Sequence, residues 1–206
     1  MTLKLVLATH NAHKVSELRR ILEGVDVELL DAAAVELPEV DETGETFADN
    51  ARLKARESAA HSGLPCIADD SGLTVEGLDG EPGVRSARYA GEPKDDQRNL
   101  DLVMERAAGL ADRAAAFVCV AALAMPDGRD WLTVGELPGT LADAPRGVGG
   151  FGYDPVFIPE GDDRTVAELS ADEKDAVSHR GMAFRAMLPV IEALSEPDPA
   201  PWEDGD

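Results

Sequence analysis

The segment CIADDSGLTV, residues 66–75, has the apolar character of a strand but is broken by two adjacent aspartates, Asp69 and Asp70. Asp-Ser-Gly is common turn material, so one interpretation is a strand that simply ends in a turn. Two neighbouring carboxylates, however, oppose each other's ionisation unless a cation lies close by. Mg²⁺ binds one or two carboxylates together with phosphate oxygens and water, and ligand sites in α/β sheets lie at the carboxyl ends of strands. We therefore favour a strand end that presents carboxylates to a cation.

Strand-like and helix-like patterns alternate around this segment in the first half of the chain, whereas the second half contains a long apolar hairpin. The expected strands are residues 3–8, 25–30, 66–75, 114–125, 131–137 and a short one around 156–157. The expected helices are residues 14–22, 46–61, one that begins near residue 95 and a last one over 178–194. The expected helix caps are Thr9 or Asn11 and the capping box SADE at 170–173. The order predicts an α/β fold with a mixed sheet, not a purely parallel one.

The chain of 206 residues is long enough for one domain, or two closely packed lobes, with a substantial core. We expect this single domain to cover residues 1–195. The remaining segment, 196–206, is rich in proline and acid, and this composition predicts a disordered tail.

The charge of the chain excludes some classes of function. Forty-one acidic and nineteen basic residues give a formal net charge of −22, which repels the backbone of DNA and RNA, so we expect no nucleic acid polymer as a partner. A small anionic substrate requires a local cluster of cations or a divalent metal. The longest apolar run, 114–125, is too short to cross a bilayer, and the start of the chain lacks signal-peptide flanks. We therefore expect a cytoplasmic protein without a membrane partner.

Two segments near the start of the chain have residues suited to phosphate and metal. In ATHNAHK, residues 8–14, a strand leads into a helix, where main-chain N–H groups favour anions. Lys14 in the first turn opposes the helix dipole unless a phosphate lies nearby, although an exposed lysine without a role is the alternative. In DETGETF, residues 41–47, Asp41 and Glu42 precede a helix and could be metal ligands or merely solvated charge.

Two later segments have residues suited to a nucleobase. RGVGGFGYDP, residues 146–155, matches the glycine spacing of dinucleotide-binding proteins, but no helix follows directly, so we reject a dinucleotide oxidoreductase. A flexible main chain remains, with Phe151 and Tyr153 as stacking faces for a base, or else a purely structural turn. In EKDAVSHRG, residues 173–181, the cations Lys174, His179 and Arg180 could bind an anion or a purine edge. Arginine donors suit the O6 acceptor of a 6-oxopurine better than the amino group of adenine.

Together these segments resemble the Ham1-like inosine triphosphate pyrophosphatase family, the bacterial XTP/dITP pyrophosphatases. The motifs that carry the resemblance, in order along residues 3–195, are THNAHK, ETGETFADNARLKA, ADDSGL, PGVRSARYAG, GGFGYDP and KDAVSHRG. The resemblance implies a long central mixed sheet with helices in two lobes around a cleft, and a homodimer. It also implies Mg²⁺-dependent hydrolysis of XTP, ITP and dITP to the monophosphate and pyrophosphate, which would remove these purine nucleotides from the pool.

The resemblance further implies roles for individual residues. Asp70 would activate water and contact the metal, Asp41 or Glu42 would be the other metal ligand, and Asp69 would support it. The implied substrate-binding residues are Thr9, His10, Asn11, Ala12, His13, Lys14, Lys54, Ser71, Phe151, Gly152, Tyr153, Asp154, Lys174, His179 and Arg180. Two features depart from the family pattern: His10 stands where a small residue is usual, and the acidic tail extends past the usual end.

Two other functions remain open at this point. One is a pyrophosphatase with another base preference, such as the Maf-like enzymes that act on dTTP and UTP. The other is a nucleotide sensor without turnover. No side chain is an obvious covalent nucleophile, which favours direct attack by water if the protein is an enzyme.

Overall fold

The computed structural model describes residues 2–195 and contains one mixed sheet of six strands in the order β2–β1–β3–β4–β5–β6. The strands are β1 (Leu3–Leu7), β2 (Val27–Asp31), β3 (Cys66–Val75), β4 (Ala114–Ala124), β5 (Asp130–Leu141) and β6 (Phe157–Pro159). β1 is parallel to both β2 and β3, whereas β3, β4, β5 and β6 pair in antiparallel fashion. The predicted α/β fold with a mixed sheet is therefore confirmed.

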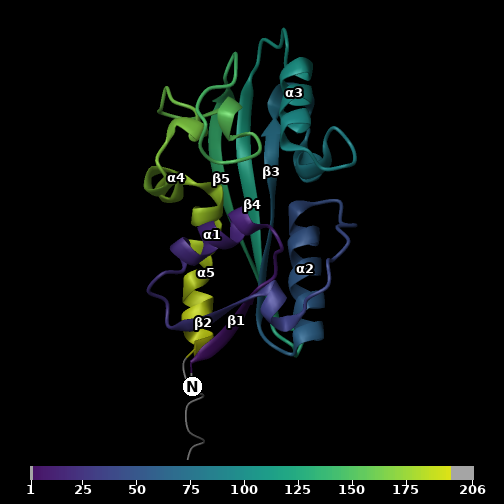
Figure 1. The fold of residues 1–206 in the computed structure, drawn as a ribbon, viewed down its shortest axis with the longest axis vertical. Coiled ribbons are helices and arrows are strands. Elements are labelled where there is room, and N and C mark those ends of the chain that lie inside the picture. The colour runs from purple at the N-terminus through teal and green to yellow at the C-terminus, as the bar shows by residue number, and fades with distance from the viewer. Residues whose placement is uncertain (1, 196–206) are drawn as a thin grey trace, which may run out of the picture.

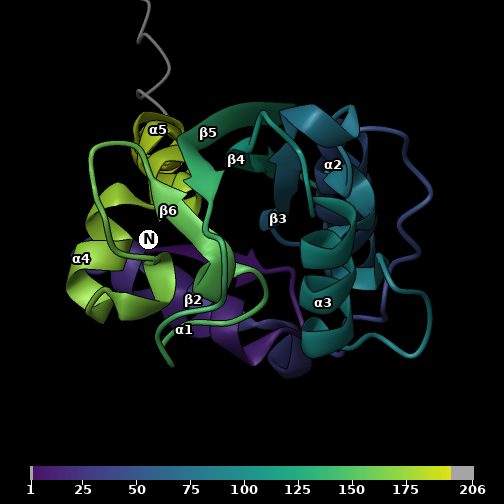
Figure 2. The same cartoon turned by 90° about the horizontal axis from the view of Figure 1, so that it is seen from above.

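Helices cover both faces of this sheet (Figures 1 and 2). The α-helices are α1 (Ala12–Ile21), α2 (Phe47–Ser62), α3 (Asp96–Arg106), α4 (Ala171–Val177) and α5 (His179–Ser195). Short 3₁₀ helices are η1 (Ala32–Val35), η2 (Glu76–Leu78), η3 (Gly83–Arg88), η4 (Asp154–Val156) and η5 (Val166–Glu168). All five lie outside the expected helices, and η4 overlaps the short strand expected around 156–157. α1 and α5 share one buried apolar cluster with the sheet, and α2 shares another with the opposite face.

The helix ends follow the signals in the sequence. Asn11 caps α1 by accepting hydrogen bonds from the main-chain N–H groups of His13 and Lys14, and Thr46 caps α2. The predicted capping box at the start of α4 is present, with Ser170 and Glu173 as its two members. These local contacts explain why the predicted boundaries agree closely with the observed ones.

β3 continues through the two aspartates, so the expectation that the strand ends there is wrong. The strand pairs with β4 along its whole length, from Cys66 opposite Ala124 to Val75 opposite Ala115. β1, by contrast, pairs with β3 only at Cys66 and Ile67 and then turns away toward α1. Asp69 and Asp70 therefore lie where β3 loses its parallel neighbour, and this position leaves room for a ligand at the edge of the sheet.

Long strands give the molecule an elongated shape, with β3, β4 and β5 running along most of its length (Figure 1). A third apolar cluster packs α3 against the far ends of these strands. The division into two lobes stays a prediction, and the predicted disorder of 196–206 lies outside the described residues. Within residues 2–195, no helix is both long and apolar enough to span a bilayer.

Candidate active site

A cleft of about 810 Å³ lies beside the open edge of β3. It is lined by the turn between β1 and α1, the segment before α2, residues 69–72 of β3, η3, the glycine-rich loop before η4 and the residues around the start of α5. Of the site residues that the sequence predicts, all but Ala12 line this one cleft. Ala12 is exposed at the start of α1. His10, the departure from the family pattern, is an exposed residue of the cleft wall.

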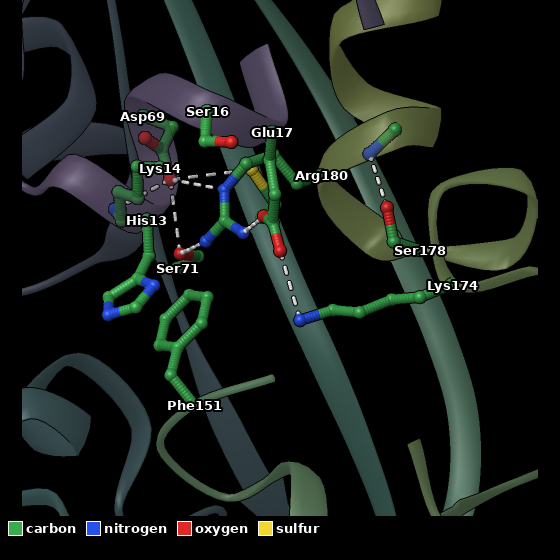
Figure 3. Close-up of polar contacts among 12 residues, drawn as sticks. His13, Lys14, Ser16, Glu17, Asp69, Ser71, Phe151, Lys174, Ser178 and Arg180 are labelled. Atoms are coloured by element: carbon green, nitrogen blue, oxygen red, sulfur yellow. Dashed lines mark hydrogen bonds and ion pairs between the residues drawn. The ribbon is translucent and has the colours of Figure 1, made fainter. Parts of the chain in front are cut away.

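Asp69 and Asp70 point to opposite faces of the sheet because successive side chains of a strand alternate. Asp69 faces α1 and α5, where its Oδ2 accepts hydrogen bonds from Lys14 Nζ at 2.7 Å and from Arg180 Nε at 3.4 Å (Figure 3). Asp70 faces α2, where it accepts from Asn50 Nδ2 at 3.1 Å and from Lys54 Nζ at 3.4 Å. The two carboxylates are thus neighbours in the chain with separate surroundings.

These surroundings shift the pKa values of the two acids in opposite directions. Burial alone would raise the pKa of Asp69, but the charges of Lys14, Arg180 and Lys54 outweigh it and hold this pKa well below the ordinary value. Burial raises the pKa of Asp70, and the charge of Glu42 adds to this effect while Lys54 and Lys14 oppose it. Asp69 is consequently a fixed anion between cations, and Asp70 is the more basic carboxylate of the pair.

Glu42 and Asp70 converge on one cation at the α2 side of the cleft. The ammonium of Lys54 lies 2.7 Å from Glu42 Oε1 and 3.4 Å from Asp70 Oδ1. Two carboxylates that share one positive group fit the needs of Mg²⁺, which takes its remaining ligands from phosphate and water. Residues 2–195 hold no group of three or more histidine, cysteine or acidic side chains arranged to bind a metal ion. Asp41 lines the cleft but is exposed, so Glu42 is the better placed of the two acids.

The side of the cleft that faces α1 and α5 has an aromatic ring with cations beside it. Lys174 Nζ lies 4.8 Å and the Arg180 guanidinium carbon 5.8 Å from the centre of the Phe151 ring. His13 stacks on the same ring with 5.2 Å between the centroids (Figure 3). Asp154 accepts hydrogen bonds from the main-chain N–H of Phe151 at 2.9 Å and from Lys174 at 2.7 Å. A flat ring with hydrogen-bonding groups beside it suits a planar base.

Glu17 is a part of this network that the sequence motifs do not predict. It is buried on α1, where Oε1 accepts from Lys174 Nζ at 2.9 Å and Oε2 accepts from Arg180 Nη1 (Figure 3). A glutamate in a helix of mixed charge resembles a surface residue in sequence. The available signal was its spacing of three residues from Lys14, which places both side chains on the same face of the helix.

His179 sits in an enclosed position at the start of α5. Its ring stacks on Phe117 with 4.9 Å between centroids, and Nδ1 has no hydrogen-bond partner among the described residues. Burial lowers the pKa of His179 well below 6.5, so the ring is neutral at physiological pH. Gly135 of β5 lets the helix approach this closely, because a Cβ there would collide with the carbonyl oxygen of His179 and lie 2.6 Å from the main-chain nitrogen of Ala183.

Comparisons with known proteins show to which family this chain belongs. The sequence pattern of the Ham1 family matches residues 5–190. The dITP/XTP pyrophosphatase of Streptomyces coelicolor is 55% identical, with 93% of this chain and 98% of that protein covered. The protein of the same name from Mycobacterium tuberculosis is 50% identical over 93% and 97% of the two chains.

Solved structures support the same relationship. The fold matches a Ham1 protein from Coxiella burnetii with a TM-score of 0.86 and 40% identity, over 93% of this chain and 99% of that one. It also matches a nucleoside-triphosphatase, a dITP/XTP pyrophosphatase, from Mycobacterium abscessus with a TM-score of 0.75 and 48% identity, over 91% and 100%. The chain is a member of the Ham1 family.

Proposed function

We propose that this protein hydrolyses the non-canonical purine nucleoside triphosphates XTP, ITP and dITP to the monophosphate and pyrophosphate, and so removes them from the nucleotide pool. The observation that carries the proposal is the single cleft that joins a helix N-terminus, two convergent carboxylates and a cation-rimmed aromatic ring. The names of the relatives, dITP/XTP pyrophosphatases at about half identity, support the same reaction.

At the phosphate end, the N-terminus of α1 and the nearby cations bind the triphosphate. The dipole of a helix N-terminus attracts anions, and Lys14 adds a full positive charge there. Thr9 and Asn11 lie in the same turn, where Asn11 N–H donates to Thr9 Oγ1 at 3.2 Å. Ser71 completes this part of the cleft from the strand side, with its hydroxyl donating to Asp69 at 3.1 Å.

Glu42 and Asp70 are the residues that would hold Mg²⁺, which when bound withdraws charge from the phosphate oxygens and promotes attack by water. Asp70 accepts the proton of the attacking water, because it lines the cleft on the α2 side beside Glu42, whereas Asp69 is already paired with Lys14 and Arg180 on the other face. Lys54 balances both carboxylates in the absence of metal. Asp69 serves the opposite face, where it fixes Lys14 toward phosphate and Arg180 toward the base.

At the base end, Phe151 stacks on the purine while Arg180 and Lys174 supply donors. A 6-oxopurine offers these donors an acceptor at C6, whereas adenine offers an amino group that also donates. The neutral ring of His179 adds one further nitrogen at the wall of the cleft. This arrangement favours hypoxanthine and xanthine over adenine.

The partner and location of the protein are part of the proposal. We propose a cytoplasmic homodimer that binds no nucleic acid polymer, in line with the net charge of −22. Light scattering of the purified protein tests the dimer, and a mass of one chain would contradict it.

The proposal is tested by turnover of XTP, ITP, dITP, ATP, GTP, dTTP and UTP with and without Mg²⁺, with pyrophosphate and phosphate measured separately. We expect Mg²⁺-dependent release of pyrophosphate from the first three nucleotides. Preference for dTTP or UTP would favour the Maf-like alternative, and binding of ITP without turnover would favour a sensor. Release of phosphate, or equal turnover of ATP, would contradict the proposal.

A further inference from the structure

We propose that Arg88 is a positioning residue that holds the metal-binding segment 37–46 against the cleft and sets Glu42 in place. This inference rests on the proposed role of Glu42 as a ligand of Mg²⁺. Residues 37–46 contain no helix or strand, so nothing in their own main-chain pattern fixes the position of Glu42. The contacts that the segment makes with its neighbours must therefore fix it.

Arg88 contacts Glu42 at two points. Its Nη1 donates to Oε2 of the carboxylate at 3.0 Å, and its Nη2 donates to the main-chain carbonyl oxygen of the same residue at 3.3 Å. Lys54, the other cation at Glu42, contacts the carboxylate through Oε1 at 2.7 Å. A metal ion would compete with both cations for the carboxylate oxygens. The main-chain carbonyl stays available to Arg88, so this arginine can hold the segment in the metal-free and the metal-bound states alike.

Arg88 is the last residue of η3, which lies against β3, the strand that carries Asp70. Ser86 connects this short helix to β3 by accepting a hydrogen bond from the main-chain N–H of Leu73 at 3.0 Å. Gly72 makes the close approach feasible, since a Cβ there would lie 2.6 Å from the carbonyl oxygen of Gly83. β3 and η3 thus connect Asp70 to Glu42 over a short distance. The contacts along this connection are buried, except those that the Arg88 guanidinium makes.

The same short helix also supports the base end of the cleft. The hydroxyl of Tyr153 donates to the main-chain carbonyl oxygen of Ser86 at 2.8 Å, and this contact is buried. Tyr153 follows Phe151 by two residues in the glycine-rich loop. η3 therefore supports both the metal-binding segment 37–46 and the glycine-rich loop that carries Phe151.

The test compares Arg88→Met with Arg85→Met, a matched control in the same short helix. Arg85 pairs with Glu81 and does not contact Glu42. In metal-free enzyme, we expect hydrogen exchange of main-chain amides in peptides from 37–46 to become about tenfold faster in Arg88→Met, because a charge-assisted hydrogen bond is lost. Arg85→Met should leave these peptides unchanged.

A second measurement addresses the metal directly. We expect the Mg²⁺ concentration for half-maximal turnover of ITP to rise about tenfold in Arg88→Met, with kcat at saturating Mg²⁺ within about twofold of the parent. The Mg²⁺ concentration for half-maximal turnover in Arg88→Lys should lie between those of the parent and of Arg88→Met, since one ammonium replaces two separate donors. In a Glu42→Gln background, Arg88→Met should not weaken Mg²⁺ activation further.

Three results would overturn the inference. The first is exchange and Mg²⁺ dependence in Arg88→Met that match those of Arg85→Met. The second is a raised KM for ITP at saturating Mg²⁺ with unchanged exchange, because it would make Arg88 a direct substrate contact. The third is an equal weakening of Mg²⁺ activation by Arg88→Met in the parent protein and in the Glu42→Gln background. If the parent protein does not hydrolyse ITP, the proposed function fails, while the exchange experiment still decides whether Arg88 holds the segment.

Discussion

Replacement of Glu17 by glutamine tests whether the buried network at the base end stabilises the fold. Among residues 2–195, Glu17 is the one carboxylate that contacts both Lys174 and Arg180. Glutamine keeps the size of the side chain but removes its charge, which leaves two buried cations with one fewer anion between them. Lys174 retains Asp154 and Arg180 retains Asp69, so the loss should be partial.

The expected size follows from this geometry. Removal of one partner from a buried ion pair costs about 3–5 kcal/mol, and the remaining partners place Glu17→Gln near the lower end, about 3 kcal/mol. For a chain of this length, this loss corresponds to a decrease in Tm of about 6–12 °C. KM for ITP should rise in the same variant, because both cations line the base end of the cleft.

Urea unfolding and calorimetry of Glu17→Gln measure the loss, with Glu28→Gln as the control. Glu28 pairs with Lys4 at 3.7 Å, and both side chains are about half exposed. The same substitution there should lower the free energy of unfolding by less than about 0.5 kcal/mol. An equal loss in the two variants, or less than about 1 kcal/mol for Glu17→Gln, would refute the reasoning.

Three further predictions concern the residues of the cleft. Asp70→Asn should lower kcat for ITP by about 10²–10⁴-fold, as expected for a lost general base, and retain binding of ITP by calorimetry; turnover within tenfold of the parent would argue against this role. Because the pKa of His179 is held well below 6.5, the unfolded chain takes up a proton that the native protein does not as the pH falls below 6.5. The free energy of unfolding of the metal-free protein should therefore fall by about 1 kcal/mol between pH 6.5 and 5.5, and His179→Gln should remove this decrease in urea unfolding; an unchanged decrease would contradict the shift. Phe151→Leu should raise KM for ITP about tenfold or more through loss of base stacking, and an unchanged KM would exclude the ring from the base site.

Local signals in the sequence were sufficient for much of the fold. Asn11 and Thr46 are good helix caps because they bind main-chain groups a few residues away, and such contacts depend little on the rest of the chain. The mixed sheet also follows from local patterns, because strands and helices alternate in the first half of the chain and an apolar hairpin comes after them. The residues of the candidate site were found as motifs, and the fold brings nearly all of them to one cleft.

Features that depend on distant partners were not predicted. The sequence shows Asp69 and Asp70 as a pair, but only the position of β1 explains why the strand continues through them. Glu17 and Arg88 look like ordinary surface charges in sequence, because the ion pairs that hold them depend on charged residues from other elements. Their partners are 163 and 46 residues away along the chain.

Gly135 changes how sequence variants of this protein should be interpreted. The glycine lies in β5 under the first turn of α5, is not among the residues that line the cleft, and has no functional group of its own. Any side chain at this position would push away the helix start that carries His179 and Arg180. A screen that ranks variants by their distance from the cleft would class Gly135→Ala as harmless, whereas its effect should match that of a lost binding residue. Substitutions in the contact surface between β5 and α5 should therefore impair the enzyme in the same way as substitutions of its binding residues.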